Sequence, residues 1–343
     1  MKAIVKDKPG KGMVVRDVPV PKPGHTDVLV RVKAAGICGT DAHIYNWDPW
    51  AQGRIKPPLT VGHEFVGEIV ELGSEVAGYR PGEIVSAEGH IACGHCALCR
   101  TGQGHICRDV KIIGVDRDGC FAEFISMPAT NLWRVPAEIP IEYAAIFDPL
   151  GNAFHTVLTA QIPGSTVMVL GCGPIGLMAI AIARASGAVK VIATETNALR
   201  QRLAKTMGAH VVLDPSNADI VKAVMDETDG LGVDVACEMS GHPEATRQAL
   251  RCTRNGGRVQ LLGIPTREIP LDLAKDVIFK GITVYGVNGR RMYETWHQMS
   301  AYLRAGMIDL APVITHRVAF AEFERGISAI TSGEAGKVVL FMD

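Results

Sequence analysis

The segment from residue 166 to residue 195 constrains the fold more than any other part of the sequence. It begins with an uninterrupted apolar run over residues 167–170, which is typical of a buried parallel strand. Three glycines with the spacing G-x-G-x-x-G follow, and a helical pattern then covers residues 175–185. A second apolar run, 189–194, ends directly at Glu195. The segment therefore predicts a strand, a glycine-rich turn, a helix and a second parallel strand.

The glycines and the final carboxylate meet the requirements of a dinucleotide site. Gly171 permits a tight turn, Gly173 lets a pyrophosphate approach the backbone, and Gly176 allows close packing of helix on strand. The N-terminus of the helix offers free N–H groups to the phosphates. Glu195 follows Gly176 by 19 residues, where a carboxylate accepts hydrogen bonds from the adenosine ribose. Because these pieces occur in this order, they predict a dinucleotide site rather than a purely structural turn.

Length and composition limit the class of protein. A chain of 343 residues suggests about two domains, and a hydrophobic content of 47% argues against disorder. The net charge of −1 gives no general attraction to nucleic acid or to an anionic membrane, so neither partner is expected. We find no signal-peptide pattern and no apolar run of membrane-spanning length. Nine cysteines without a secretory spacing pattern indicate the reducing cytoplasm.

The pattern of residues changes near position 153, which predicts two domains. Before it, short strands are interrupted by glycine and proline, as in a separate β-rich domain. After it, strands alternate with helices, which predicts right-handed crossovers and a six-stranded, doubly wound parallel sheet. The fold class is therefore α/β with a second, β-rich domain. The strands predicted in the first part cover residues 28–32, 65–72, 84–85 and 121–125.

Ligands of doubly wound sheets bind beyond the carboxyl ends of the strands. The residues at these predicted strand ends are therefore candidates for contact with the dinucleotide. They are Glu195, Ser240, Gly263, Ile264, Val287 and Asn288.

Two groups of metal-type residues lie in the β-rich part. The first comprises Cys38 and the later pair His63 and Glu64. A thiolate, an imidazole and a carboxylate fit a zinc site that keeps one position open for water or substrate. Because Cys38 and His63 are distant in sequence, a packed or surface position is the competing interpretation for each.

The second group consists of four cysteines within 15 residues of loop-like sequence, namely Cys93, Cys96, Cys99 and Cys107. Four thiolates at this spacing predict a closed tetrahedral zinc site, which orders a loop and carries no chemistry. An iron–sulfur cluster is the alternative, because the first three cysteines share its spacing. The gap of seven residues before Cys107 and the lack of a following proline argue against a cluster. The isolated cysteines are predicted to be buried thiols: Cys120, Cys172, Cys237 and Cys252.

Several motifs together resemble the zinc-dependent medium-chain dehydrogenase/reductase family, along essentially the whole chain. They are Gly62-His63-Glu64, the four-cysteine loop, Gly119-x-Phe121-Ala122-Glu123 and the glycine motif. The resemblance implies a GroES-like, zinc-binding catalytic domain over residues 1–152, completed by 292–343, and a Rossmann domain over 153–291 that binds NAD. It also implies two zinc ions per subunit, one catalytic and one structural, and a homotetramer.

The resemblance further implies roles for individual residues. Cys38 and His63 would hold the catalytic zinc with an acidic residue, for which Glu64 and Asp148 are both candidates. Asp148 stands where relatives acting on sugar alcohols commonly have glutamate, so a role behind the metal or in proton relay is open to it. Thr40 and His43 would pass on the proton of the substrate hydroxyl, with a turn beside Cys38 as the alternative. The implied cofactor residues are Gly171, Gly173, Ile175, Gly176, Glu195, Arg200, Leu262, Gly263 and Ile264.

Four stretches resemble the branch of this family that acts on L-threonine; they cover residues 37–48, 88–90, 147–156 and 294–296. The implied reaction is NAD-dependent oxidation at C3 to 2-amino-3-oxobutanoate, a first step of threonine degradation towards glycine. Because this substrate carries an ammonium and a carboxylate, its pocket needs charged groups. Candidates are Glu88, His90, Asp148 and Arg290.

Two other functions remain open at this point. One is the same chemistry on a polyol or diol such as sorbitol or butanediol, because only the pocket would differ. The other is a non-catalytic zinc protein that uses the four-cysteine loop to bind a partner, against which the complete dinucleotide motif argues.

Overall fold

A computed structural model of the protein describes residues 1–265 and 267–342. It contains two compact units. The first comprises 1–148, 291–305 and the chain from Ile314 onward, and the second comprises 149–290 and 306–313. The predicted domain boundaries differ from those of the two units in two places. The boundary predicted at residue 152 falls inside a continuous helix, Phe147–Leu158, within which the first unit already ends at Asp148. Residues 306–313, which include the buried Ile308 and Leu310, belong to the second unit and not to the first. Thr266 and Asp343 fall in the predicted domain ranges but outside the described residues.

The first unit is built on a seven-stranded sheet with the order β10-β6-β5-β3-β18-β17, to which β9 adds by pairing with β3. A three-stranded sheet, β2-β1-β4, and the short pair β7-β8 accompany it. Its strands are β1 (Lys2–Lys6), β2 (Val14–Asp17), β3 (Asp27–Ile37), β4 (Leu59–Thr60), β5 (Glu64–Leu72), β6 (Ile84–Ala87), β7 (His90–Ile91), β8 (Lys111–Ile112), β9 (Phe124–Pro128), β10 (Leu132–Arg134), β17 (Ile314–Ala319) and β18 (Lys337–Phe341).

Helices of the first unit are mostly short. The α-helices are α1 (Gly39–Asn46), α2 (Pro49–Arg54), α3 (Ala97–Arg100), α4 (Ile141–Ala144), α10 (Glu294–Arg304) and α11 (Phe323–Thr331), and α5 (Phe147–Leu158) begins here. The 3₁₀-helices are η1 (Gly104–Ile106), η2 (Ala129–Asn131) and η4 (Phe320–Glu322).

The C-terminal tail closes the sheet of the first unit. Strand β18 pairs antiparallel with β3, with Val338 opposite Ile37, so the last strand lies beside one of the first. Buried apolar residues from β3, β5, α11 and β18 form one continuous core, which includes Val30, Phe65, Ile327 and Val338. This pairing matters for the site below, because it brings the start of β18 to the end of β3.

One strand predicted in this unit is wrong in its position. The strand β9 covers Phe124–Pro128 instead of residues 121–125. The backbone of Phe121 instead bonds to Ile4 and Val61, because the buried Phe121 ring fills the space beside Gly62.

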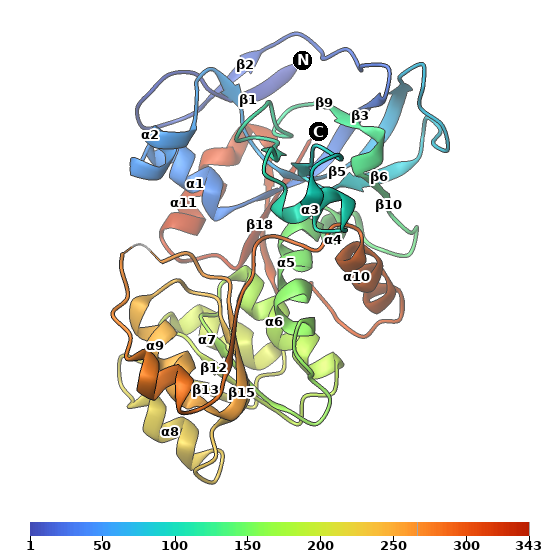
Figure 1. The fold of residues 1–343 in the computed structure, drawn as a ribbon. Helices are drawn as coiled ribbons and strands as arrows, with labels where there is room; N and C mark the ends of the chain where they lie inside the picture. Colours follow the sequence, from blue (N-terminus) through green and yellow to red (C-terminus); the bar gives the residue numbers. More distant parts are fainter. Residues whose placement is uncertain (266, 343) are drawn as a thin grey trace. The chain divides into compact units, whose positions relative to one another are not determined.

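The second unit contains a six-stranded parallel sheet with the order β13-β12-β11-β14-β15-β16, which confirms the predicted α/β fold class. Helices α6 and α7 contact each other, as do α8 and α9 (Figure 1). The strand order reverses between β11 and β14, so right-handed crossovers place these two helix pairs on opposite faces. The elements are β11 (Thr166–Leu170), α6 (Pro174–Ala185), β12 (Lys190–Thr194), α7 (Ala198–Thr206), β13 (Val211–Leu213), α8 (Ile220–Asp226), β14 (Val233–Glu238), α9 (Pro243–Cys252), β15 (Thr253–Leu261), the π-helix η3 (Ala274–Ile278) and β16 (Thr283–Gly286).

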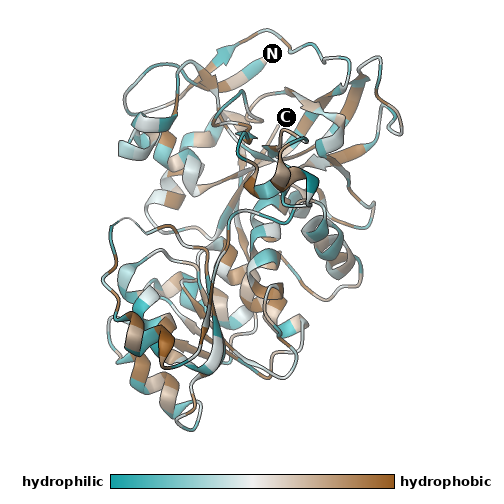
Figure 2. Cartoon of the chain, in the orientation of Figure 1, coloured by the Kyte–Doolittle hydropathy of each residue, from teal (hydrophilic) through white to brown (hydrophobic). Residues whose placement is uncertain are grey.

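The first βαβ turn of this unit packs as its glycines predict. A Cβ atom on Gly176 would lie 2.0 Å from the carbonyl oxygen of Gly171, so only glycine lets α6 approach the strand this closely. Strands β11 and β12 are buried along almost their whole length. Figure 2, which colours each residue by hydropathy, shows brown hydrophobic residues on strands and helices of both units. No helix among the described residues is long and apolar enough to cross a membrane.

Candidate functional site

Three predicted metal ligands lie together in the first unit. Donor atoms of Cys38, His63 and Glu64 are all within 4.8 Å of one another. Cys38 follows the end of β3, and His63 immediately precedes β5. Since these strands are antiparallel neighbours, with Gly36 opposite Glu64, the two distant parts of the sequence meet at the same end of the sheet.

Local backbone geometry explains how His63 reaches this position. Gly62 has φ of +91°, in the left-handed region that favours glycine, and a Cβ atom there would lie 2.2 Å from the ring of Phe121. The glycine therefore allows the chain to turn between β4 and β5 while the Phe121 ring packs against it.

The cluster is surrounded by buried charges that the sequence did not reveal. Lys337, at the start of β18, donates a hydrogen bond from Nζ to Glu64 Oε1 at 2.7 Å, and both side chains are at most 3% exposed. Asp41 Oδ2 accepts the backbone N–H of Cys38 at 2.8 Å, and Asp41 Oδ1 lies 4.0 Å from His63 Nδ1. Asp41 thus lies behind the imidazole, where a carboxylate can orient a metal-binding histidine.

Several polar atoms of this cluster have no hydrogen-bond partner in the described part of the chain. They are Asp41 Oδ1, His63 Nδ1 and Glu64 Oε2, all buried. Asp41 Oδ1 and His63 Nδ1 face each other 4.0 Å apart, behind the imidazole ring. A buried carboxylate oxygen is normally satisfied, so Glu64 Oε2 fits a cation bound beside Cys38 and His63. Thiolate, imidazole and carboxylate are the donor types that zinc prefers.

The charges shift the pKa values of these groups strongly. Burial alone would lower the pKa of His63, but the adjacent Cys38 and Asp41 raise it to about 10. Burial raises the pKa of Asp41 and of Glu64, while Lys337 opposes the rise for Glu64. The pKa of Lys337 is also raised, because Glu64 and Cys38 outweigh its own burial. Without a metal the cluster therefore holds protons, which a bound cation would replace.

The geometry separates the two acidic candidates. Glu64 offers an oxygen to the three-residue cluster, whereas Asp148 is not among the atoms within 4.8 Å. Asp148 lies beside Gly89, where an added Cβ atom would be 3.7 Å from Asp148 Oδ2, and its charge acts on both His63 and Glu64. Glu64 is therefore the third member of the cluster in this structure, and Asp148 lies outside it as a neighbour.

The predicted relay residues share one face of α1. Thr40 Oγ1 lies 3.8 Å from Cys38 Sγ. His43 follows Thr40 by three residues on the same helix, so the two side chains lie one turn apart on neighbouring positions. His43 is exposed, and its Nδ1 is hydrogen-bonded to Asp48.

The candidate substrate residues lie in different places. Glu88 is buried and accepts hydrogen bonds from Trp296 Nε1 at 3.0 Å and from the backbone N–H of His90 at 3.0 Å. His90 Nδ1 lies 3.2 Å from the same carboxylate. Arg290 belongs to the second unit and is 1% exposed, with its side-chain carbons packed on Gly151.

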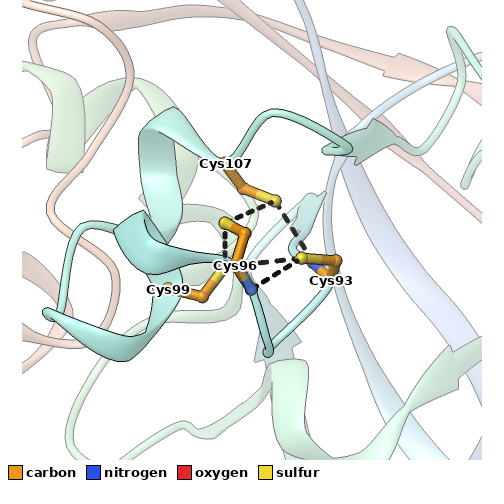
Figure 3. A group of neighbouring side chains, drawn as sticks. All are labelled: Cys93, Cys96, Cys99 and Cys107. Carbon is orange, nitrogen blue, oxygen red and sulfur yellow. Dashed lines mark hydrogen bonds between the residues drawn. The ribbon is translucent and has the colours of Figure 1, made fainter.

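The four cysteines of the second group point their sulfurs toward one another (Figure 3). The Cys96 sulfur lies 3.5 Å from that of Cys99 and 3.9 Å from that of Cys107, and the sulfurs of Cys93 and Cys99 are 3.9 Å apart. Four thiolates at Zn–S distances of about 2.3 Å around a tetrahedral zinc would be roughly 3.8 Å apart. These separations also exclude a disulfide, and all four residues are free cysteines.

Backbone N–H groups support this sulfur cluster. The N–H groups of Cys93 and Asp109 both donate to Cys107 Sγ, and that of Cys96 donates to Cys93 Sγ. Such hydrogen bonds lower the pKa of Cys107 and hold the pKa of Cys96 at about 6. Burial and its sulfur neighbours raise the pKa of Cys99, because four thiolates this close need a cation to stay ionised.

The second unit has a cavity of about 470 Å³ at the carboxyl ends of its strands. Predicted cofactor residues Gly171, Gly173, Glu195 and Arg200 line it, together with Ser240. Gly173 is the N-cap of α6, no side chain caps that helix end, and a Cβ atom at Gly173 would meet nothing within 4 Å. The open helix terminus fits the pyrophosphate of a dinucleotide.

Glu195 is held firmly at the edge of this cavity. Its Oε1 accepts the backbone N–H groups of Thr196 and Asn197, each at 2.9 Å, and its Oε2 accepts that of Cys172 at 2.9 Å. The Oε2 atom therefore retains capacity to accept a ribose hydroxyl group.

The other predicted cofactor residues do not line this cavity. Leu262 and Gly263 donate their backbone N–H groups to the Glu238 carbonyl oxygen, and Val287 donates to Leu261. Ile264 is 87% exposed. Ile175, Gly176 and Asn288 are likewise absent from the lining. Sequence reasoning missed part of the cavity wall, because these residues carry no motif: Pro215, Ser216, His242, Glu244, Ala245 and Gln248.

Two family models of known proteins match this chain, one in the β-rich part and one in the part with the parallel sheet. Residues 174–305 match the family model described as zinc-binding dehydrogenase, and residues 24–137 match the alcohol dehydrogenase GroES-like domain. An L-threonine 3-dehydrogenase from Bacillus licheniformis is 52% identical over 99% of this chain and 98% of its own. The chain belongs to the zinc-dependent medium-chain dehydrogenase/reductase family. Its members are oxidoreductases, and the resemblance inferred from the motifs is confirmed.

Solved structures show the same fold. A zinc-binding dehydrogenase from Sinorhizobium meliloti 1021 bound to NADP is 33% identical, with a TM-score of 0.91 and coverage of 99% of both chains. A 2R,3R-butanediol dehydrogenase from Bacillus subtilis is 29% identical, with a TM-score of 0.91 over 100% of this chain and 99% of the other. Zinc and a nicotinamide dinucleotide are therefore the cofactors of this family.

The four isolated cysteines, Cys120, Cys172, Cys237 and Cys252, are free and buried, as predicted.

Proposed function

We propose that this protein oxidises the C3 hydroxyl group of L-threonine to 2-amino-3-oxobutanoate, with NAD as the hydride acceptor. The observation that carries the proposal is the 52% identity to an L-threonine 3-dehydrogenase along 99% of the chain. The butanediol dehydrogenase, which represents the diol alternative, is only 29% identical. A non-catalytic zinc-loop protein would need neither the Cys38 cluster nor the dinucleotide cavity.

The residues of the Cys38 cluster would serve the chemical step. Cys38, His63 and Glu64 would hold zinc, which when bound supplies a Lewis acid that lowers the pKa of an alcohol. The Thr40 hydroxyl, beside Cys38, would accept the proton of the substrate hydroxyl while giving up its own proton towards His43, which follows it on α1 and would take up that proton. Asp148 adds negative charge near the cluster, which favours the ammonium group of threonine. The substrate carboxylate still needs a cation or N–H donors, and His90 is our candidate.

The four cysteines would hold a second, structural zinc, giving two per subunit. Three of their sulfur–sulfur separations are 3.5–3.9 Å, close to the tetrahedral spacing, and all four sulfurs lie within 4.8 Å of one another. Between Cys93 and Cys107 the loop contains a four-residue helix and a three-residue 3₁₀-helix, too little regular structure to hold its own shape. A metal cross-link supplies the missing order.

The cavity of the second unit would bind NAD in preference to NADP. Glu195 places a negative charge where the 2′-phosphate of NADP would lie, although Arg200 lines the same cavity. The substitution Glu195→Ser should weaken NAD binding and narrow the preference for NAD over NADP by about tenfold, which corresponds to about 1.4 kcal/mol, the worth of one or two hydrogen bonds. Steady-state kinetics with both cofactors measure it, and equal use of NADP by the wild type would contradict this role of Glu195.

A cytoplasmic homotetramer is the assembly that we propose. All nine cysteines are free, as in a reducing compartment. Strand β16 is an edge strand of the parallel sheet, and near it Ile278 and Phe279 are 67% and 82% exposed. Exposed edge strands and apolar side chains favour association with another chain. Light scattering should give four times the chain mass of 36.7 kDa.

Formation of NADH with a panel of alcohols tests the proposed substrate. We expect L-threonine to be oxidised with a kcat/KM at least 100-fold above that of 2,3-butanediol or sorbitol, because a pocket built for charged groups rejects analogues lacking them. An equal or higher kcat/KM with either alcohol would move the protein to the diol and polyol branch. The absence of NADH formation with every alcohol would favour the non-catalytic alternative.

A further inference from the structure

The imidazole ring of His43 is held by a carboxylate on the neighbouring helix. His43 Nδ1 is hydrogen-bonded to Asp48 Oδ2. The other oxygen, Asp48 Oδ1, accepts the backbone N–H of Ala51 at 3.0 Å and so caps the N-terminus of α2. The same carboxylate therefore fixes the first turn of α2 and the ring of His43 in the last turn of α1. The indole of Trp50 also lies near the His43 ring, with ring centroids 6.0 Å apart.

The corner between the two helices is fixed independently of this pair. Trp47 ends α1 in the left-handed conformation, with φ of 57°, and its N–H donates to the His43 carbonyl oxygen at 2.9 Å. Lys6, which is fully buried, places Nζ 4.8 Å from the centre of the Trp47 ring and donates to the Gly12 carbonyl oxygen at 2.9 Å. Asp48 directly follows Trp47, so the fixed position of Trp47 places the Asp48 carboxylate next to His43.

This contact determines which nitrogen of His43 carries the proton. A carboxylate only accepts hydrogen bonds, so Nδ1 of the neutral ring must be the donor and Nε2 keeps a free lone pair. The N–H of Ala51 lowers the pKa of Asp48 further, and His43 adds to this, so the acceptor stays ionised. A proton relay needs this arrangement, with one nitrogen anchored and the other available.

We infer that Asp48 is a positioning residue for proton transfer, holding His43 in the Nδ1–H tautomer so that Nε2 can accept the proton released from the substrate. The inference rests on the oxidation proposed above and adds a residue to it. Asp48 touches neither substrate nor cofactor in this scheme and acts through His43 alone.

The variant Asp48→Asn separates this role from helix capping. Asparagine is as good an N-cap as aspartate, so its Oδ1 can keep the bond to Ala51. Its NH₂ group would then face His43 Nδ1 and force the ring proton onto Nε2. We expect kcat for L-threonine to fall about 100-fold, the lower end of what general acid–base catalysis contributes, with KM little changed. The NADH dissociation constant, zinc content and thermal midpoint should stay at wild-type values.

A double-variant cycle tests whether Asp48 acts through His43. With His43→Ala as background, adding Asp48→Asn should cause no further loss of kcat, because the ring to be positioned is gone. The matched control is Asp219→Asn, since Asp219 caps α8 in the same way, by accepting the N–H of Lys222 at 3.1 Å. Its kcat should remain within twofold of wild type.

Two results would overturn the inference: a kcat of Asp48→Asn within twofold of wild type, or losses that multiply in the double variant. Failure of the proposed substrate gives a different result, namely wild-type enzyme that oxidises another alcohol but not L-threonine. The same variants, assayed with that alcohol, then decide the role of Asp48 by the same criteria.

Discussion

The first unit contains two clusters of metal-type residues, and they are built in opposite ways. The four-cysteine cluster comes from one loop, has four donors of the same kind, and its sulfurs accept backbone N–H groups. The Cys38 cluster joins three different donors from two strands and is surrounded by charged side chains. Around a zinc ion, the first would fill all four tetrahedral positions with sulfur. The second would leave one position for a reacting molecule, and the charges around it shift the pKa values of its donors.

This difference implies that the two clusters tolerate change differently. A closed cluster should contribute to local order and little to chemistry. An open cluster should contribute to chemistry and should depend on neighbours that never touch the metal. The following substitutions test this contrast, from the largest expected effect to the smallest.

Substitution of a ligand in the open cluster should abolish activity and leave the closed cluster intact. We expect Cys38→Ser to lower kcat/KM about 1000-fold, since Lewis-acid assistance is worth several kcal/mol of barrier. Zinc analysis should find one metal per chain instead of two. Retention of both metals and of activity within tenfold would show that Cys38 is not a ligand.

Removal of the buried cation beside the open cluster should destabilise the fold. Lys337→Met leaves the carboxylate of Glu64 buried without its partner, at a cost of about 3–5 kcal/mol in unfolding free energy. Lys33→Met is the matched control, because Lys33 on β3 also pairs with a glutamate of β5, Glu68, but the two side chains are 39% and 32% exposed. Its loss should stay below about 1 kcal/mol. Denaturant titration measures the free energy of unfolding of both variants. Equal losses of stability would mean that the Lys337–Glu64 pair contributes no more than a solvent-exposed ion pair.

Substitution of a cysteine in the four-cysteine cluster should release the structural metal but reduce activity only slightly, in contrast to substitution of Cys38. Cys99→Ser should lose the structural metal and make the loop sensitive to protease, because this loop has little regular structure of its own. We expect kcat/KM to fall no more than about tenfold, or 1.4 kcal/mol. Mass spectrometry of a brief digest locates the cut. A loss as large as that of Cys38→Ser would place chemistry in this loop.

Mild chelation should distinguish the clusters without any substitution. An open site exchanges its metal through the vacant position, whereas four thiolates enclose theirs. Activity should therefore disappear while about one zinc per chain remains, and added zinc should restore it. If both metals leave at the same rate, the four-cysteine site is not closed.

The sequence predicted what short segments determine. The strand, glycines and helix of the dinucleotide motif and the four-cysteine loop lie within runs of fewer than about 30 residues, and their spacing reflects local geometry. Glu195 could be chosen as a candidate for the ribose contact because it directly follows a buried strand. The strand at 121–125 was misplaced because Phe121 packs against Gly62, a contact between segments far apart in sequence.

Tertiary structure decided what distant segments do to one another. Lys337 lies 273 positions from Glu64 and reads as an ordinary charged residue until β18 pairs beside β3 and buries it. Asp41 and Asp48 belong to a run that looks like a polar turn, yet one is fully buried behind His63 and the other fixes the ring of His43. The sequence could name donor types by their spacing, because covalent spacing limits local geometry. Burial and ion pairing arise from chain segments that meet only on folding, so only the structure shows which charges surround the site.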